Sequence, residues 1–249
     1  MSKYKSIALL MIFTILMLVI LGFAEIKQDA MTVTDIEISI DDQYENYFIS
    51  ESDILQILNE DIFLKGAEYQ RINLKVLENK LERNQFVQDA EVFKDLKGKM
   101  NVNIMQNRPI ARVVRENAVD AYINFDGRIL PVSERFTARL PIISGALGDE
   151  LIANGLQETE EGQQLMRFLE FLMDDPFWKA QIAQIDISKD WDMILYPQIS
   201  KQLVEFGKPV EIDAKFKNLK IFYTRILPQQ GWNTYSRVSV KYQNQIICE

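Results

Sequence analysis

The pattern of apolar and polar residues first sets apart a segment near the start of the chain. Residues 7–24 are uncharged and apolar except for Thr14. A run of about 18 such residues forms a helix of about 27 Å, just long enough to cross the hydrocarbon core of a membrane. Lysines precede the run and acidic residues follow it. The positive-inside tendency therefore predicts a cytoplasmic tail at residues 1–6, a transmembrane helix at residues 7–24 and a linker at residues 25–32 beyond the membrane.

The alternative for this segment is a cleaved signal peptide. Gly22 and Ala24 are small residues at the spacing that a signal peptidase recognises. The apolar run is longer than the core of about 7–15 residues that is usual in signal peptides, which favours a retained anchor. In both cases the rest of the chain lies outside the cytoplasm.

Residues 33–107 are predicted to form a compact module with the element order β-α-α-β-β. Residues 33–40 read as a strand, and Ser50 with Asp53 has the spacing of a capping box that opens a helix. A second helix begins near Asn73, and two strands follow around a glycine turn. Apolar residues lie on one face of each predicted helix and alternate along the last predicted strand. They are Ile54, Leu55, Ile57, Leu58, Leu74, Leu77, Leu81, Met100, Val102 and Ile104.

Residues 108–249 are predicted to form a larger, mainly antiparallel β domain with flanking helices, so the fold class of the chain is α+β. Asp126 and Gly127 have the composition of a hairpin turn between two strands. Thr159 is expected to cap a helix with one apolar face. The remaining predicted elements are strands at residues 182–187, 193–196 and 202–206, a helix at residues 212–227 and a last strand at residues 237–248.

The last predicted strand, residues 237–248, alternates apolar and polar residues and contains neither Pro nor Gly. Long regular strands at a sheet edge invite pairing with other chains, so proteins normally blunt them with prolines or charges. This strand has only two charges, on Arg237 and Lys241. The alternation places Tyr242 on the face of Val240, the expected core side. It leaves open whether Tyr242 is buried or is turned outward by a bulge.

Composition excludes several classes of function. The net charge of -8 argues against a nucleic-acid binder and against a polybasic membrane-binding patch. The chain has no histidine and one cysteine, Cys248, so Ser-His-Asp catalysis, Cys-His catalysis and a zinc site rich in His or Cys cannot be built. Residues 186–192 alternate like a calcium loop, but Trp191 and Pro197 stand where the turn glycine and the bidentate glutamate belong, which favours a hairpin turn. We therefore predict no catalytic residue, no metal, no cofactor and no small-molecule substrate.

The order of these parts resembles the bacterial cell-division family FtsQ/DivIB, whose members carry a POTRA domain followed by a β domain. The motifs that carry the resemblance are FVQDAEVFKDLKGKMNVNIMQNRPIARV at residues 86–113 and YINFDGRILP at residues 122–131, followed by VEFGKP near Gly207, FKNLKIF and the terminal VKYQN. Their order and spacing cover nearly the whole chain beyond the apolar segment. Asn124 replaces the aspartate that is usual in this family, and the cytoplasmic tail is very short.

The resemblance implies a non-enzymatic scaffold of the inner membrane, with the N-terminus in the cytoplasm, the bulk in the periplasm and an expected position at the division septum. Family members join early division proteins to the FtsB–FtsL coiled-coil pair, which regulates septal peptidoglycan synthesis. Their last strand receives a partner segment by strand addition, so residues 237–248 become a docking edge. The expected partner-binding residues are Arg237, Ser239, Lys241, Tyr242, Gln243, Gln245 and Ile247.

Two other functions compete with the scaffold. A secretion or outer-membrane assembly factor that contains POTRA domains would show further POTRA repeats or a long barrel pattern, and the sequence shows neither. A membrane-anchored hydrolase would need two carboxylates that converge in a cleft, a juxtaposition that only folding could create.

Overall fold

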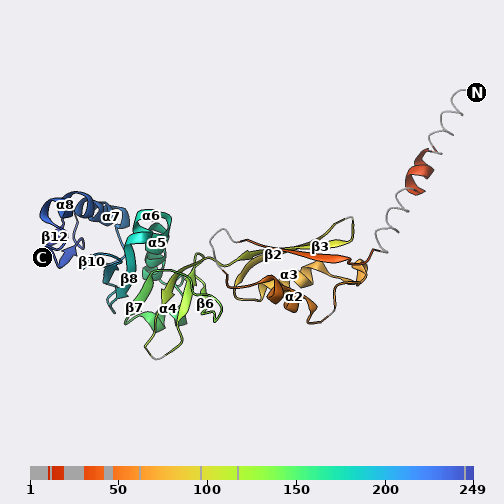
Figure 1. Cartoon of the computed structure of the whole chain (residues 1–249), viewed down its shortest axis with the longest axis horizontal. Helices are drawn as coiled ribbons and strands as arrows, with labels where there is room; N and C mark the ends of the chain where they lie inside the picture. The colour runs from red at the N-terminus through yellow and green to blue at the C-terminus, as the bar shows by residue number, and fades with distance from the viewer. Residues whose placement is uncertain are drawn as a thin grey trace, which may run out of the picture. The chain divides into compact units, whose positions relative to one another are not determined.

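The computed structural model describes residues 11, 13–19, 31–41, 47–61, 63–95, 97–116, 118–243 and 245–249. The chain divides into two compact units, residues 1–106 and residues 107–249, which are described separately below (Figure 1).

The expected membrane anchor lies mostly outside the described residues. Its described part, Met11 and residues 13–19, is helical. Among the residues that the structure describes, no helix is both long enough and apolar enough to span a membrane. The expected tail at residues 1–6 lies outside the described residues, as does all of the expected linker except Met31 and Thr32.

The first unit has the predicted β-α-α-β-β order and forms a three-stranded sheet with strand order β1-β3-β2. Strand β3 is central because it pairs in parallel with β1 and antiparallel with β2. The two helices lie on one side of this sheet (Figure 1). The elements are β1 (Asp35–Ile40), α2 (Glu51–Asn59), the short 3₁₀ helix η1 (Tyr69–Arg71), α3 (Leu74–Glu82), β2 (Val87–Lys94) and β3 (Lys99–Gln106).

Local sequence signals account for this unit. The capping box is present before α2: the Asp53 amide donates to the Ser50 hydroxyl, and the Ser50 amide donates to the Asp53 carboxylate at 2.8 Å. Asn73 caps α3. The alternation along β3 buries Met100, Val102 and Ile104 against the helices, as predicted. On the apolar face of α2, Ile54 and Leu58 form the buried stripe, whereas Leu55 at its margin is 37% exposed.

The second unit is built on a sheet formed by nine strands of the described residues, in the order β12-β11-β10-β9-β8-β7-β4-β5-β6. Most neighbouring pairs are antiparallel, whereas β4–β7, β7–β8 and β10–β11 are parallel. The strands are β4 (Pro109–Val113), β5 (Ala121–Asn124), β6 (Ile129–Pro131), β7 (Ile142–Gly145), β8 (Ile182–Ile187), β9 (Met193–Pro197), β10 (Leu203–Gly207), β11 (Arg237–Ser239) and β12 (Ile247–Cys248).

Helices pack on this sheet around an aromatic core. Phe168 of the long helix contacts Phe206 of β10 and Phe216 of a later helix, with ring centroids 5.0 and 5.5 Å away, and all three side chains are fully buried. The sequence had not indicated α4, α6 or β7, which are too short for a periodic pattern. The helices are α4 (Gly148–Asn154), α5 (Glu160–Asp174), α6 (Pro176–Gln181), α7 (Ile212–Ile221), the π-helical segment η2 (Phe222–Ile226) and α8 (Leu227–Gln230).

The predicted hairpin turns are present. The amide of Gly127 donates to the carbonyl of Asn124 at 3.0 Å, and Gly127 has a φ of +74°. Asn124 is buried, and its side-chain oxygen accepts the amides of Asp126 and Arg128 at 3.0 and 2.7 Å. Residues 188–192 join β8 to β9, so the segment that resembled a calcium loop is a turn.

The expected single strand at residues 237–248 was wrong. Strand β11 ends at Ser239, the chain turns, and β12 returns antiparallel to β11, with Val238 opposite Cys248. The physical reason is visible in the sequence: Asn244 stands where the alternation requires an apolar residue, and the polar run at residues 243–245 favours a turn. Strand β11 is therefore an inner strand, covered by β10 on one side and by β12 on the other.

Candidate partner-binding edge

The outermost strand at this end of the sheet is β12. Arg237 and Glu249 exchange two backbone hydrogen bonds, of 3.0 and 2.9 Å, which makes them a hydrogen-bonded pair of the antiparallel ladder. Backbone direction alternates along a strand, so the N–H and C=O groups of Cys248 point away from β11. These two groups form the open edge of the sheet.

The side chains of this edge alternate as well. Ile246 and Cys248 are half-buried and pack on the core of the unit, and burial raises the pKa of the Cys248 thiol. Ile247 points to the other side and is 39% exposed. Gln245 is exposed. Strand β12 thus presents an apolar side chain beside backbone groups that point away from the sheet, the combination that a partner strand requires.

Two of the expected contact residues lie on the inner strand β11. Arg237 forms an ion pair with Glu205 of β10. Ser239 is only 7% exposed, and within the described part of the chain its hydroxyl has no hydrogen-bond partner. Neither backbone is open to an added strand, because β12 occupies that side of β11. The sequence placed both residues at the edge because it treated the two strands as one.

The turn between β11 and β12 holds the remaining expected residues. The ammonium group of Lys241 lies 2.6 Å from the carboxylate of Asp192, which raises the pKa of Lys241. The side-chain amide of Gln243 donates to Glu211, at the start of α7. Tyr242 is 56% exposed, so the turn directs it outward and its burial in the core is excluded.

A close backbone approach fixes the turn. Gly207, at the end of β10, has a φ of +72°, and a Cβ atom there would lie 2.8 Å from Cγ of Lys241. Both the conformation and the contact require glycine. Lys241 therefore crosses directly over Gly207 on its way to Asp192, and the turn is tied to the ends of β9 and β10.

A surface pocket of about 370 Å³ adjoins this turn through Glu211. It lies between α5 and the segment that leads from β10 into α7. Its lining combines apolar and charged side chains: Arg167, Phe171, Val210, Glu211, Ile212 and Asp213.

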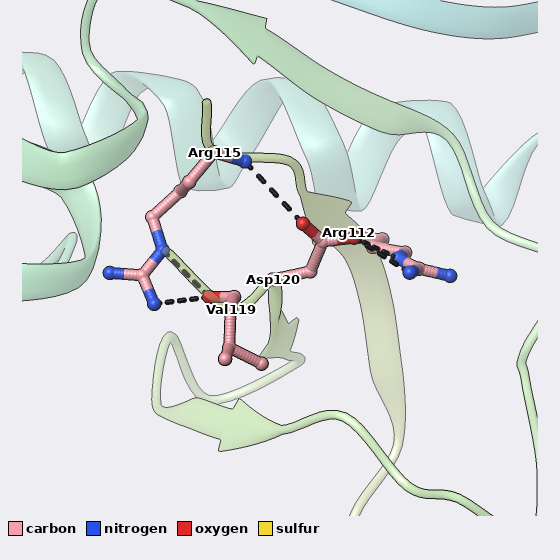
Figure 2. A network of polar contacts seen from close by, with 4 residues as sticks. All are labelled: Arg112, Arg115, Val119 and Asp120. Atoms are coloured by element: carbon pink, nitrogen blue, oxygen red, sulfur yellow. Dashed lines mark hydrogen bonds and ion pairs between the residues drawn. The ribbon is translucent and has the colours of Figure 1, made fainter. Parts of the chain in front are cut away.

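Charged side chains also form hydrogen bonds within the loop between β4 and β5 (Figure 2). The guanidinium of Arg112 donates to Asp120 at 2.6 and 2.9 Å, and the guanidinium of Arg115 folds back onto the carbonyl of Val119. Arg115 also lies 3.5 Å from Asp149 of α4. The donors of both arginines are directed at groups of the chain itself, so this cluster organises the loop. Within the described ranges no group of three or more His, Cys, Asp or Glu side chains could hold a metal ion.

Comparison with known families agrees with this architecture. Residues 32–105 match the model of the POTRA-like domain, and residues 108–249 match the model described as FtsQ/DivIB, C-terminal related. The second match covers more than half of the chain and includes the whole candidate edge. The chain belongs to the FtsQ/DivIB family. No curated protein matches this FtsQ/DivIB chain. The family resemblance expected from the sequence motifs is confirmed, and with it the assignment to cell division.

Proposed function

We propose that this FtsQ/DivIB protein is a non-enzymatic scaffold of the division machinery and that a partner segment adds to the open edge of β12. In this proposal residues 7–24 anchor the protein in the inner membrane and both units lie in the periplasm. The partner is the coiled-coil pair FtsB–FtsL, through which the protein acts on septal peptidoglycan synthesis. The observation that carries the proposal is the outward direction of the Cys248 backbone, on the last strand of a family-matched domain.

Backbone hydrogen bonds alone do not provide the binding free energy of a micromolar complex. Two outward groups can form about two hydrogen bonds, worth about 1 kcal/mol each net, whereas micromolar binding needs about 8 kcal/mol. Side chains must supply the difference. Tyr242 and Ile247 are exposed apolar groups beside the edge, whereas the charge of Lys241 is already paired with Asp192.

A proline at Cys248 tests strand addition directly. Cys248→Pro removes an outward N–H group but none of the hydrogen bonds that hold β12 to β11. We expect about tenfold weaker binding of the cognate coiled-coil pair, measured by titration calorimetry. Cys248→Ala is the matched control because it keeps the N–H group, and it should bind like the unmodified chain. Unchanged binding by Cys248→Pro would exclude addition at β12.

Localisation tests the division role independently of the edge. A fluorescent domain fused after residue 249 through a long linker should form a band at midcell before constriction is complete. Uniform envelope signal from a functional fusion would contradict the division role. Diffuse periplasmic signal would show that the segment ending at Ala24 is cleaved.

A further inference from the structure

The first unit has its own strand edge, the outer side of β2. The amide of Asp95 donates to the carbonyl of Lys99 at 2.9 Å. Because backbone direction alternates along a strand, the backbone groups of Phe93 and Glu91 also point toward β3 and form hydrogen bonds with it. The backbone groups of Ala90, Val92 and Lys94 therefore point away from the sheet. Exposed edges of this kind are templates for pairing with other chains.

One of these groups is already occupied. The carboxylate of Glu78, on α3, accepts the outward N–H of Val92 at 3.0 Å. The ammonium of Lys75, one turn earlier on the same helix, lies 3.2 Å from the other oxygen of Glu78. The Glu78 side chain is 19% exposed. Its pKa is lowered, chiefly by the hydrogen bond from Val92, so it holds this position as a carboxylate.

We propose that Glu78 closes the β2 edge against pairing with the β2 edge of a second copy of this chain. In a two-fold antiparallel pair centred on Val92, the two Val92 residues would exchange the central hydrogen bonds. Glu78 takes the N–H that this pair needs, and its negative charge would face the incoming carbonyl oxygen. In such a pair Glu91 would lie opposite Phe93 of the other copy, and Phe93 is 46% exposed. Removal of the Glu78 side chain would therefore free the central N–H group and take the carboxylate away from the centre of the pair.

Amide exchange of the intact chain in detergent tests the contact. Glu78→Ala should accelerate hydrogen exchange at the Val92 amide by about tenfold, since a hydrogen bond to a charged group is lost. Glu78→Gln is the matched control because its side-chain oxygen can still accept the same N–H group. Lys75→Ala keeps the carboxylate and should leave the Val92 amide protected. Unchanged Val92 exchange in Glu78→Ala would overturn the proposal.

Sedimentation velocity tests the consequence. Glu78→Ala should shift to a larger species with rising concentration relative to the unmodified chain, and Glu78→Gln should not. The double variant Glu78→Ala with Val92→Pro lacks the central N–H and should lose the added association. If Glu78→Ala exchanges faster at Val92 but sediments like the unmodified chain, Glu78 does not guard this edge and the proposal fails.

Discussion

At the scale of single residues, the surroundings of Lys215 change the pKa of its ammonium group. Lys215 lies in α7 and is 5% exposed. Its ammonium donates to the carbonyl of Lys208 at 2.8 Å and lies 4.8 Å from the ring centre of Phe206. Burial lowers the pKa of Lys215, and the charges of Glu211 and Asp192 oppose that change only in part. Nothing in the sequence marks this lysine as different from its exposed neighbour Lys217.

The lowered pKa of Lys215 predicts a pH dependence of stability. Between the folded pKa and the ordinary value of 10.5, the unfolded chain binds more protons than the folded chain, so stability conferred at this site rises with pH. Lys215→Met removes the titrating group. The stability of the unmodified chain should therefore rise relative to Lys215→Met as pH increases toward 10.5, as measured by urea unfolding. Lys217→Met is the control, and an equal pH trend for both variants would contradict the assignment.

At the scale of elements, the start of α5 shows why local propensity and packing can oppose each other. Gly162 lies in the first turn of the helix, and its amide donates to the Thr159 hydroxyl at 3.1 Å. A Cβ atom at Gly162 would lie 2.1 Å from the carbonyl oxygen of Leu156. The chain before the helix folds back across its first turn, and only a residue without a side chain leaves room for it.

Gly162→Ala should therefore destabilise the protein although alanine favours helices by about 1 kcal/mol over glycine. We expect the free energy of unfolding to fall by about 2 kcal/mol, in the range of other overpacked sites. Chemical unfolding followed by circular dichroism measures this change. Glu161→Ala, at the exposed neighbouring position, should change stability by less than about 1 kcal/mol. A stabilised Gly162→Ala would show that the predicted contact does not exist.

At the scale of the whole molecule, the two units have separate hydrophobic cores. One core gathers around β3 and the helices α2 and α3, and the other surrounds the aromatic cluster of α5, β10 and α7. Each unit is compact, and the boundary between the two units in the sequence lies between Gln106 and Asn107. Each unit can therefore unfold by its own cooperative transition.

Scanning calorimetry should show two unfolding transitions, and Gly162→Ala should lower only one of them. Leu81→Ala, which removes a fully buried side chain of α3, should lower only the other. A single transition that both variants shift together would show that the units unfold as one body.

The sequence by itself determined the elements whose signals are local. The capping box at Ser50, the alternation along β3 and the apolar stripe of α5 are set by neighbours within a few residues, and they indicated the first unit and most of the second. The family motifs extended this to the cell-division assignment. Short elements such as α4 and β7 gave no periodic signal and were missed.

Only the tertiary structure decided which strand is the edge. The order of β10, β11 and β12 depends on pairings between residues far apart in the chain, and these pairings turned Tyr242 outward and placed Cys248 at the open edge. The contact between Glu78 and Val92 likewise joins a helix to a strand edge. The periodicity of apolar residues indicates which face of an element is buried. It does not indicate which strand or side chain forms hydrogen bonds with the backbone N–H and C=O groups of that element.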